Sequence, residues 1–154
     1  MQRLAAELCK RGVTNMKLCD ASTTQASYLI ADMFRLSHIV LASPAYSLSI
    51  CPVMESLLSE MKMLNLQNRH IALVENRSWA CPVGDLMEDC IDENMKDMEV
   101  LNERLSMSSP LPDSKGREVG SLAQAIADSM GEVTCGCSKR FEKKQKQEEP
   151  EKRF

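Results

Sequence analysis

The sequence predicts an α/β protein in which helices cover both faces of a doubly wound parallel sheet, giving three layers. Two observations support this fold class. Helical and strand-like segments alternate along the chain, and the strand-like segment 39–42 and residues 71–74 of the strand-like segment 70–74 are continuous apolar runs. Such runs are typical of parallel strands that are buried on both faces. We therefore expect the order helix, strand, helix, strand, helix, strand, helix, strand, helix.

The first expected elements lie in residues 2–18. Leu4 and Leu8 fall on one stripe of a helix over 2–12, and Gly12 supplies its C-terminal stop. Residues 13–18 alternate between apolar and polar side chains, which predicts a half-buried strand.

A second helix and a second strand follow a polar loop that begins at Asp20. The helix is expected over 28–34, and the strand over 39–42. The helix should turn four apolar side chains inward, namely Leu29, Ile30, Met33 and Phe34.

A third helix is expected over 52–64, where Pro52 suits the first helical position. Its inward stripe should comprise Val53, Leu57, Met61 and Leu64. After the strand 70–74 the sequence predicts a helix over 82–95, a strand over 98–105 and a last helix over 117–130, capped by Gly131.

Length and composition predict one domain and a tail. A chain of 154 residues can bury one core, and its hydrophobic share of 44% and charged share of 27% are those of a soluble globular protein. We expect the domain to span 1–131 and a charged, disordered tail to span 132–154. No apolar run approaches the roughly 20 residues that cross a bilayer, and the short apolar run 4–9 is no signal peptide. A cytoplasmic protein without membrane contact is expected.

Charge and cysteine usage narrow the function classes. Residues 139–154 carry seven Lys/Arg against four Asp/Glu, so a net charge of −3 leaves the preceding residues at −6. An acidic body does not favour nucleic-acid binding. The seven cysteines are odd in number and show no framework spacing, which indicates reduced thiols in a reducing compartment.

Two unusual loops, 43–51 and 75–81, fall at the carboxyl ends of predicted parallel strands. Ligands of open parallel sheets bind at this edge. A planar, partly apolar ring would need flat side chains on its faces and polar groups along its edge. Tyr46 and Trp79 could supply the faces, and the edge could come from Ser43, Ser47, Asn76 and Ser78. Alternatively, the two aromatic side chains only cover the end of the sheet.

Segments 20–61 (DASTTQASYLIADMFRLSHIVLASPAYSLSICPVMESLLSEM) and 66–87 (LQNRHIALVENRSWACPVGDLM) carry a family resemblance. Over roughly 2–130 the chain resembles the flavodoxin-like FMN domain of the flavodiiron (A-type flavoprotein) family. The resemblance implies FMN as cofactor, electron transfer, a reductase or rubredoxin-type donor as redox partner, and a homodimer. It also implies two loops around the flavin, one of Ser43, Pro44, Ala45, Tyr46 and Ser47, the other of Asn76, Arg77, Ser78 and Trp79.

The sequence departs from the family pattern at its start and in the second loop. Domains of this family open with a strand and a phosphate-binding turn that precede the first helix, whereas here the first expected helix starts at residue 2. The expected fold is therefore a flavodoxin-like doubly wound parallel sheet that lacks the first strand and the phosphate-binding loop. Arg77 also stands where the family has a glycine, which could approach the ring with its backbone.

Two function hypotheses follow. In the first, the chain is an FMN-binding electron-transfer module of an oxidoreductase. In the second, it is a truncated, non-catalytic flavodoxin-like fragment or interaction module that no longer binds FMN, with an exposed sheet edge that pairs with another chain.

No independent catalytic centre or metal site is expected. His38 and His70 precede strands at the amino edge of the sheet, where a structural role is favoured. Cys135 and Cys137 lack the second half of a zinc pattern. The acidic residues of the helix 82–95 should form a solvated face; they are Glu88, Asp89, Asp92 and Glu93.

Overall fold

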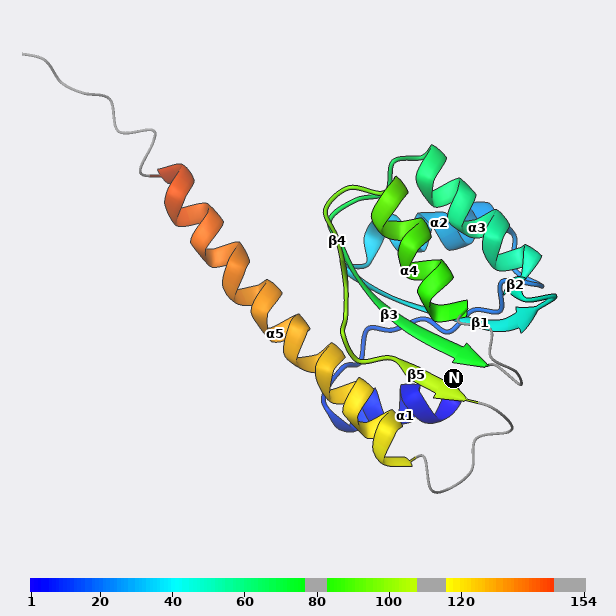
Figure 1. Ribbon diagram of the computed structural model, residues 1–154. Helices are drawn as coiled ribbons and strands as arrows, with labels where there is room; N and C mark the ends of the chain where they lie inside the picture. Colours follow the sequence, from blue (N-terminus) through cyan, green and yellow to red (C-terminus); the bar gives the residue numbers. More distant parts are fainter. Residues whose placement is uncertain (77–82, 108–115, 146–154) are drawn as a thin grey trace, which may run out of the picture.

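The computed structural model describes the backbone of residues 1–76, 83–107 and 116–145, and side chains as far as residue 131. Its elements follow one another along the chain as labelled in Figure 1. They are α1 (Gln2–Lys10), α2 (Ala26–Arg35), β1 (His38–Tyr46), β2 (Ser49–Ile50), α3 (Pro52–Met63), β3 (Arg69–Asn76), α4 (Val83–Asn94), β4 (Met98–Val100), β5 (Leu105–Met107) and α5 (Gly116–Gln145).

The strands form one mixed, mostly parallel sheet in the order β2-β1-β3-β4, and β5 also pairs with β3. β1, β4 and β5 are all parallel to β3. The short β2 is antiparallel and pairs only with Ala45 and Tyr46 at the end of β1. The central strand of the described sheet is therefore β3.

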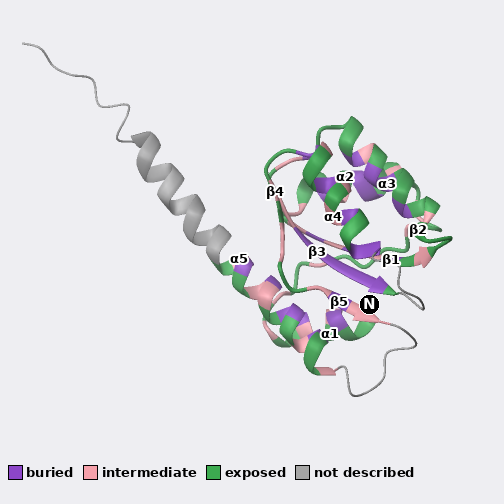
Figure 2. Ribbon diagram, in the orientation of Figure 1, coloured by how far each residue is buried: buried purple, intermediate pink, exposed green. Residues whose placement is uncertain are grey.

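Helices lie on both faces of this sheet, which confirms the three-layer α/β expectation (Figure 1). Successive residues of β1 and β3 point to opposite faces. Ile39, Leu41, Ile71 and Leu73 pack toward α2, α3 and α4, while Val40, Ala42, Ala72 and Val74 pack toward α1 and α5. In Figure 2 β3 is buried along most of its length. On β1, by contrast, the side chains that face α1 and α5 are only half-buried.

Several predicted helix ends are confirmed. Pro52 is the first residue of α3, and Gly12 follows α1 with a φ of +85°. The inward stripes are partly wrong, because Phe34, Val53 and Leu64 are 46%, 41% and 53% exposed. Leu64 lies just beyond α3, so it no longer shares the buried side of that helix.

The predicted strand 13–18 is wrong. These residues belong to no strand, and no backbone hydrogen bond joins residues 14–18 to another part of the described chain. The alternation of apolar and polar residues is present, but a strand also needs a neighbour at about 4.8 Å. A groove separates residues 13–18 from β1 in its place.

The predicted strand 98–105 and the predicted helix end at Gly131 also need correction. The strand is divided into β4 and β5, and Arg104 between them forms ion pairs with Asp85 and Glu88 on α4. Helix α5 continues through Gly131 to Gln145, because Gly131 does not adopt the positive φ by which a glycine ends a helix.

Candidate functional site

The two predicted loops start side by side at the carboxyl edge of the sheet. Ser43 is the Cα partner of Glu75, and Pro44 is the Cα partner of Asn76. On the other side of β3, Glu75 is opposite Ser106 of β5. Three parallel strands therefore end together at the edge that binds ligands in open α/β sheets.

The first predicted loop is a strand end and a tight hairpin. β1 continues to Tyr46, and β2 returns beside it from Ser49. The two turn residues, Ser47 and Leu48, have φ values of 48° and 60°, as expected for the two-residue turn that fits strand twist. Tyr46 is 60% exposed. A regular strand therefore holds this aromatic side chain at the surface, where a flat ligand could contact it.

The three residues that precede Tyr46 differ in how accessible their side chains are to a ligand. Ser43 is buried, and its hydroxyl donates a hydrogen bond to the carbonyl of Pro44 over 3.1 Å. Ala45 packs against the core beneath α3 and α4. Pro44 is exposed and lines the groove beside β1. Of these three, Pro44 alone presents its side chain to a ligand.

The second predicted loop begins at Asn76, the last residue of β3. Asn76 is exposed and lines the same groove as Pro44. Its carboxamide can both donate and accept hydrogen bonds. Arg77, Ser78 and Trp79 lie outside the described residues.

Glu75 is a residue at this edge that sequence reasoning missed as a functional position. Only 3% of it is exposed, and its Oε2 accepts a hydrogen bond of 2.8 Å from the backbone N–H of Gly84. Gly84 lies in the first turn of α4, where free N–H groups favour a carboxylate. Glu75 thus ties the end of β3 to the start of α4, on both sides of the second loop. The sequence did carry one sign of this role, because Glu75 is an acidic residue directly after the apolar residues 71–74.

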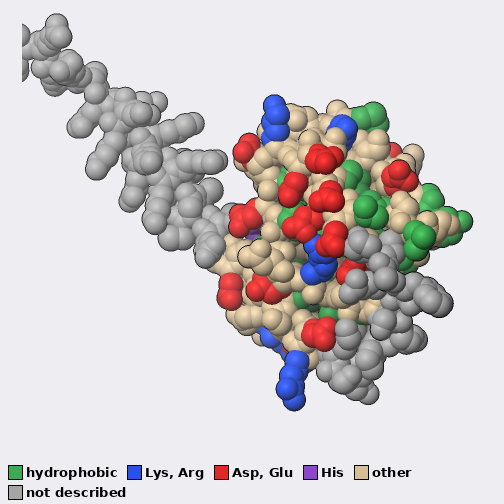
Figure 3. Space-filling model, in the orientation of Figure 1, with side chains coloured by type: hydrophobic (Ala, Val, Ile, Leu, Met, Phe, Trp, Pro, Cys, Tyr) green, Lys and Arg blue, Asp and Glu red, His purple; other side chains and the backbone are tan. Residues whose placement is uncertain are grey.

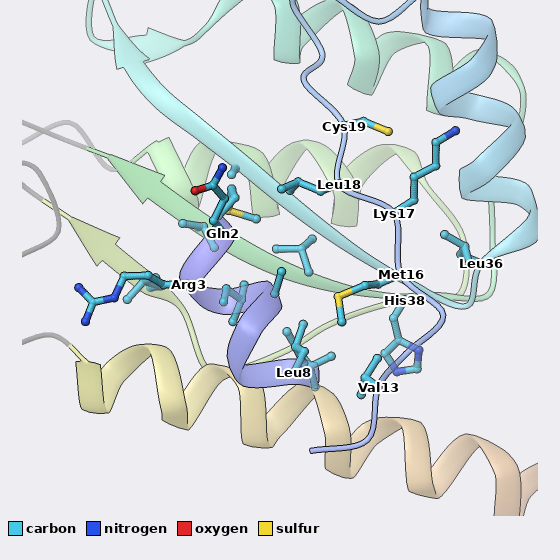
Figure 4. Close-up of a pocket in the computed structure, with 18 of the residues that line it drawn as sticks. Gln2, Arg3, Leu8, Val13, Met16, Lys17, Leu18, Cys19, Leu36 and His38 are labelled. Atoms are coloured by element: carbon cyan, nitrogen blue, oxygen red, sulfur yellow. The ribbon is translucent and has the colours of Figure 1, made fainter. Parts of the chain in front are cut away.

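The groove beside β1 has a volume of about 1840 Å³. It extends along β1 from His38 to Pro44, and its outer wall is the segment 13–20. Figure 4 shows Val13 beside His38, with Cys19 farther toward the carboxyl end of β1. Because Pro44 and Asn76 also line it, the groove opens into the candidate site.

The two histidines lie at the amino edge of the sheet, as expected, and they stack on each other. Their ring centroids are 4.6 Å apart. Burial, followed by the neighbouring His70, lowers the pKa of His38 to about 4. His38 Nε2 lies 3.1 Å from the hydroxyl of Ser129 on α5. His70 Nδ1 lies 3.2 Å from a Glu99 oxygen, without the alignment of a hydrogen bond. This pair joins β1, β3 and α5 far from the carboxyl edge.

The described part of the chain contains neither a metal-binding cluster nor a membrane-spanning helix. Among residues 1–76, 83–107 and 116–131 no group of three His, Cys, Asp or Glu side chains is arranged to hold a metal ion. No described helix has the length and apolar character that a membrane span requires.

Comparison with known proteins identifies the fold. No protein-family model and no curated protein sequence matches this chain. Rubredoxin oxygen:oxidoreductase from the anaerobe Desulfovibrio gigas matches 84% of this chain with 32% of its own, at 18% identity and a TM-score of 0.75. The flavodiiron core of Flv1 from Synechocystis matches 86% with 32% of its own, at 12% identity and a TM-score of 0.75. Oxidised flavodoxin 1 from Bacillus cereus matches 82% with 86% of its own, at 14% identity and a TM-score of 0.66.

The chain therefore has a flavodoxin-like α/β fold, as the sequence resemblance implied. It spans about a third of the length of the two flavodiiron structures and most of the flavodoxin. At these identities the likeness concerns the fold.

Proposed function

We propose that this flavodoxin-like chain binds FMN at the carboxyl edge of its sheet and serves as an electron-transfer module. The observation that carries the proposal is the pairing of Pro44 with Asn76. This pairing sets Asn76, the first residue of the second predicted flavin loop, beside the first predicted loop, at the edge where open α/β sheets bind ligands. Similarity to flavodoxin and flavodiiron structures supports the choice of a flavin.

The described residues fit a flat heteroaromatic ring at three positions. Tyr46 offers an exposed aromatic face, Asn76 offers donors and an acceptor for a polar edge, and Pro44 offers an apolar contact between them. Ser43 is not part of this set, because it is buried and its hydroxyl is bonded within the chain. Ser47, with its left-handed backbone, would shape the turn rather than contact the ring through its side chain.

FMN, when bound, would supply one- and two-electron redox chemistry. The chain's own contribution would be binding and orientation. Tyr46 and Pro44 would exclude water from the ring, and the Asn76 carboxamide would fix the direction of its polar edge. The regular hydrogen bonds of the β1–β2 hairpin would hold Tyr46 in place, which limits the entropy lost on binding.

A redox partner would dock close to this edge. Figure 3 shows acidic side chains gathered over α4, which starts beside the candidate site. The exposed ones on this helix include Asp85, Asp89, Asp92 and Glu93. A reductase or rubredoxin-type donor that presents a basic surface would be attracted to this face, and higher salt would slow their association.

The test is a titration of the purified chain with FMN, following the quenching of flavin and tryptophan fluorescence. The chain contains one tryptophan, Trp79, in the second predicted loop. It also contains two tyrosines of similar exposure, Tyr46 at 60% and Tyr28 at 64%. Loss of an aromatic contact should make Tyr46→Ser bind FMN about tenfold more weakly, whereas Tyr28→Ser on α2 is the matched control.

Saturable quenching that is weakened by Tyr46→Ser and unchanged by Tyr28→Ser would support the proposal. Absence of saturable quenching by a folded chain would reject it. Equal loss in both tyrosine variants would also reject the assignment of the site to the β1–β2 hairpin.

A further inference from the structure

Arg104 connects two elements close to the carboxyl edge of the sheet. It lies directly before β5, and its Nη1 and Nη2 atoms form ion pairs with Asp85 and Glu88 in the first two turns of α4. Only 23% of the Arg104 side chain is exposed, so these pairs are screened less than fully exposed ones. A planar guanidinium presents its donors in a rigid fork, whereas lysine has a single nitrogen. Arg104 therefore holds the start of β5 against α4.

Gly84, in the first turn of α4, makes room for this arginine. A Cβ atom at Gly84 would lie 2.6 Å from Nη1 and 2.7 Å from Cδ of Arg104, which is too close for non-bonded atoms. The Arg104 side chain thus lies directly against the backbone of α4. Gly84 is also the residue whose backbone N–H donates a hydrogen bond to the buried carboxylate of Glu75. Arg104 and Glu75 therefore hold the same helical turn.

The strand residue that follows Glu75 is Asn76, a residue of the candidate flavin site. Asn76 is opposite Met107 of β5 on one side and opposite Pro44 of β1 on the other. Its backbone is therefore held between two neighbouring strands. Since Arg104 ties β5 to α4, and Glu75 ties β3 to the same helix, the position of Asn76 depends on both contacts.

We propose that Arg104 is a positioning residue for the flavin site, because it clamps β5 to α4 and thereby holds Asn76 where its carboxamide meets the polar edge of FMN. This inference rests on the proposed function. Arg104 acts through Gly84 and β5, and it does not itself contact the flavin. A polar group that is held in place before binding loses less conformational entropy on binding. Loss of the clamp should therefore weaken FMN binding by a chain that is still folded.

Three variants of the full chain test the clamp. Arg104→Met removes the guanidinium and keeps an unbranched apolar side chain. Arg104→Lys keeps the positive charge but not the fork. Gly84→Ala keeps the arginine and displaces it with the added Cβ, so it reaches the same loss by a second route.

The matched control is Arg69→Met, at the other end of β3. Arg69 is also half-buried. Its guanidinium ties the start of β3 to the end of α2 by donating hydrogen bonds to the carbonyls of Met33 and Phe34, over 3.0 and 2.6 Å. This variant therefore removes an equivalent contact between a helix and β3, away from the candidate site.

Two measurements on each folded variant distinguish the clamp from flavin binding itself. The affinity for FMN is obtained from the quenching of flavin fluorescence. Hydrogen exchange of the backbone amides, followed by NMR in the absence of flavin, reports how firmly each end of β3 is held.

Arg104→Met and Gly84→Ala should each bind FMN about tenfold more weakly, with faster exchange of the amides 74–76 and unchanged exchange of the amides 70–71. Arg104→Lys should recover only part of the affinity. Arg69→Met should speed exchange at 70–71 and leave FMN binding unchanged.

Four outcomes would overturn the inference. Full FMN affinity in Arg104→Lys would show that charge is sufficient without the fork. Equal loss of affinity in Arg69→Met would point to general stability. Weaker FMN binding without faster exchange at 74–76 would assign Arg104 to direct contact with the flavin. Unchanged affinity in Arg104→Met and Gly84→Ala, with FMN bound by the wild type, would remove the positioning role and leave the proposed function intact. Absence of FMN binding by the wild type would instead reject the proposed function, and the positioning role with it.

Discussion

His38 of β1 stacks on His70 of β3, with ring centroids 4.6 Å apart and ring planes 11° from parallel. The two residues are Cα partners at the first position of the β1–β3 ladder. His38 also lies within hydrogen-bond distance of Ser37 and Ser129. A proton on His38 would bring a charge into this partly buried stack, which explains why burial and His70 lower its pKa to about 4.

This low pKa predicts a stability that falls between pH 6.5 and pH 4. The unfolded chain, with an ordinary histidine pKa near 6.5, binds a proton in that range, whereas folded His38 does not. Protonation therefore favours unfolding as the pH falls, and the contribution of His38 is complete above pH 6.5. Because the ring is partly exposed, we expect a loss of about 1 to 2 kcal/mol. Urea unfolding across this range would measure it.

The control for this prediction is His38→Phe, which keeps a flat ring against His70 and cannot titrate. The lowered pKa values of Glu7, Asp20 and Asp32 are present in both proteins, so the difference between the two curves isolates His38. Parallel curves for wild type and variant between pH 4 and 6.5 would refute the assignment.

Leu48→Gly should stabilise the chain by about 1 kcal/mol, because Leu48 has a φ of 60° and glycine adopts that region without strain. If Leu48, which is 76% exposed, contacts the bound flavin, the same variant will bind FMN more weakly. The matched control is Leu64→Gly, where φ is −87° and the substitution should cost about 0.5 to 1 kcal/mol. Thermal unfolding would test both, and a destabilised Leu48→Gly would contradict the hairpin geometry.

Two methionines of α3, Met61 and Met63, differ in burial, so substituting each of them compares a core position with a surface position. Met61 is 0% exposed and belongs to the core under α2, α3 and α4. Met61→Ala should therefore cost about 2 to 5 kcal/mol through lost contacts and a cavity. Met63 is 73% exposed, so Met63→Ala should change the free energy of unfolding by less than about 0.5 kcal/mol. Denaturant titrations of the pair would check the orientation of α3, and equal effects would contradict it.

The bond from Gly84 to Glu75 predicts a graded response to substitution. Glu75→Leu leaves the Gly84 N–H without its buried acceptor and should cost about 1 to 3 kcal/mol. Glu75→Gln keeps an acceptor oxygen and should cost about 1 kcal/mol or less. If the two variants unfold at the same urea concentration, the hydrogen bond does not anchor the start of α4.

Local patterns in the sequence predicted most of the fold. Pro52 and Gly12 lie where α3 starts and α1 ends, and the strand-like segments 39–42 and 70–74 lie within the two paired central strands. Residues 13–18 carry an equally good strand pattern, yet they form no strand. Periodicity reports which side chains suit a strand, but hydrogen bonding needs a neighbour that the sequence of the segment does not reveal. The sequence pattern of residues 13–18 therefore could not predict the groove beside β1.

The sequence predicted at which edge of the sheet the candidate site lies, but not how its residues are arranged there. The carboxyl edge was identified because two unusual loops follow two apolar runs, and the structure brings Pro44 and Asn76 together there. The burial of Ser43 and the left-handed turn at Ser47 and Leu48 were not foreseen. Both depend on how β2 folds back onto β1, a pairing of only two residues that leaves little signal in composition.

The most direct test of the central claim is a map of amide chemical-shift changes in the ¹⁵N-labelled chain as FMN is added. We expect saturable changes at Ala45, Tyr46, Ser47 and Asn76 around the carboxyl edge, with His38 and His70 at the amino edge unaffected. Changes confined to the amino edge or to the middle of the groove, or none at all in a folded chain, would contradict flavin binding at this site.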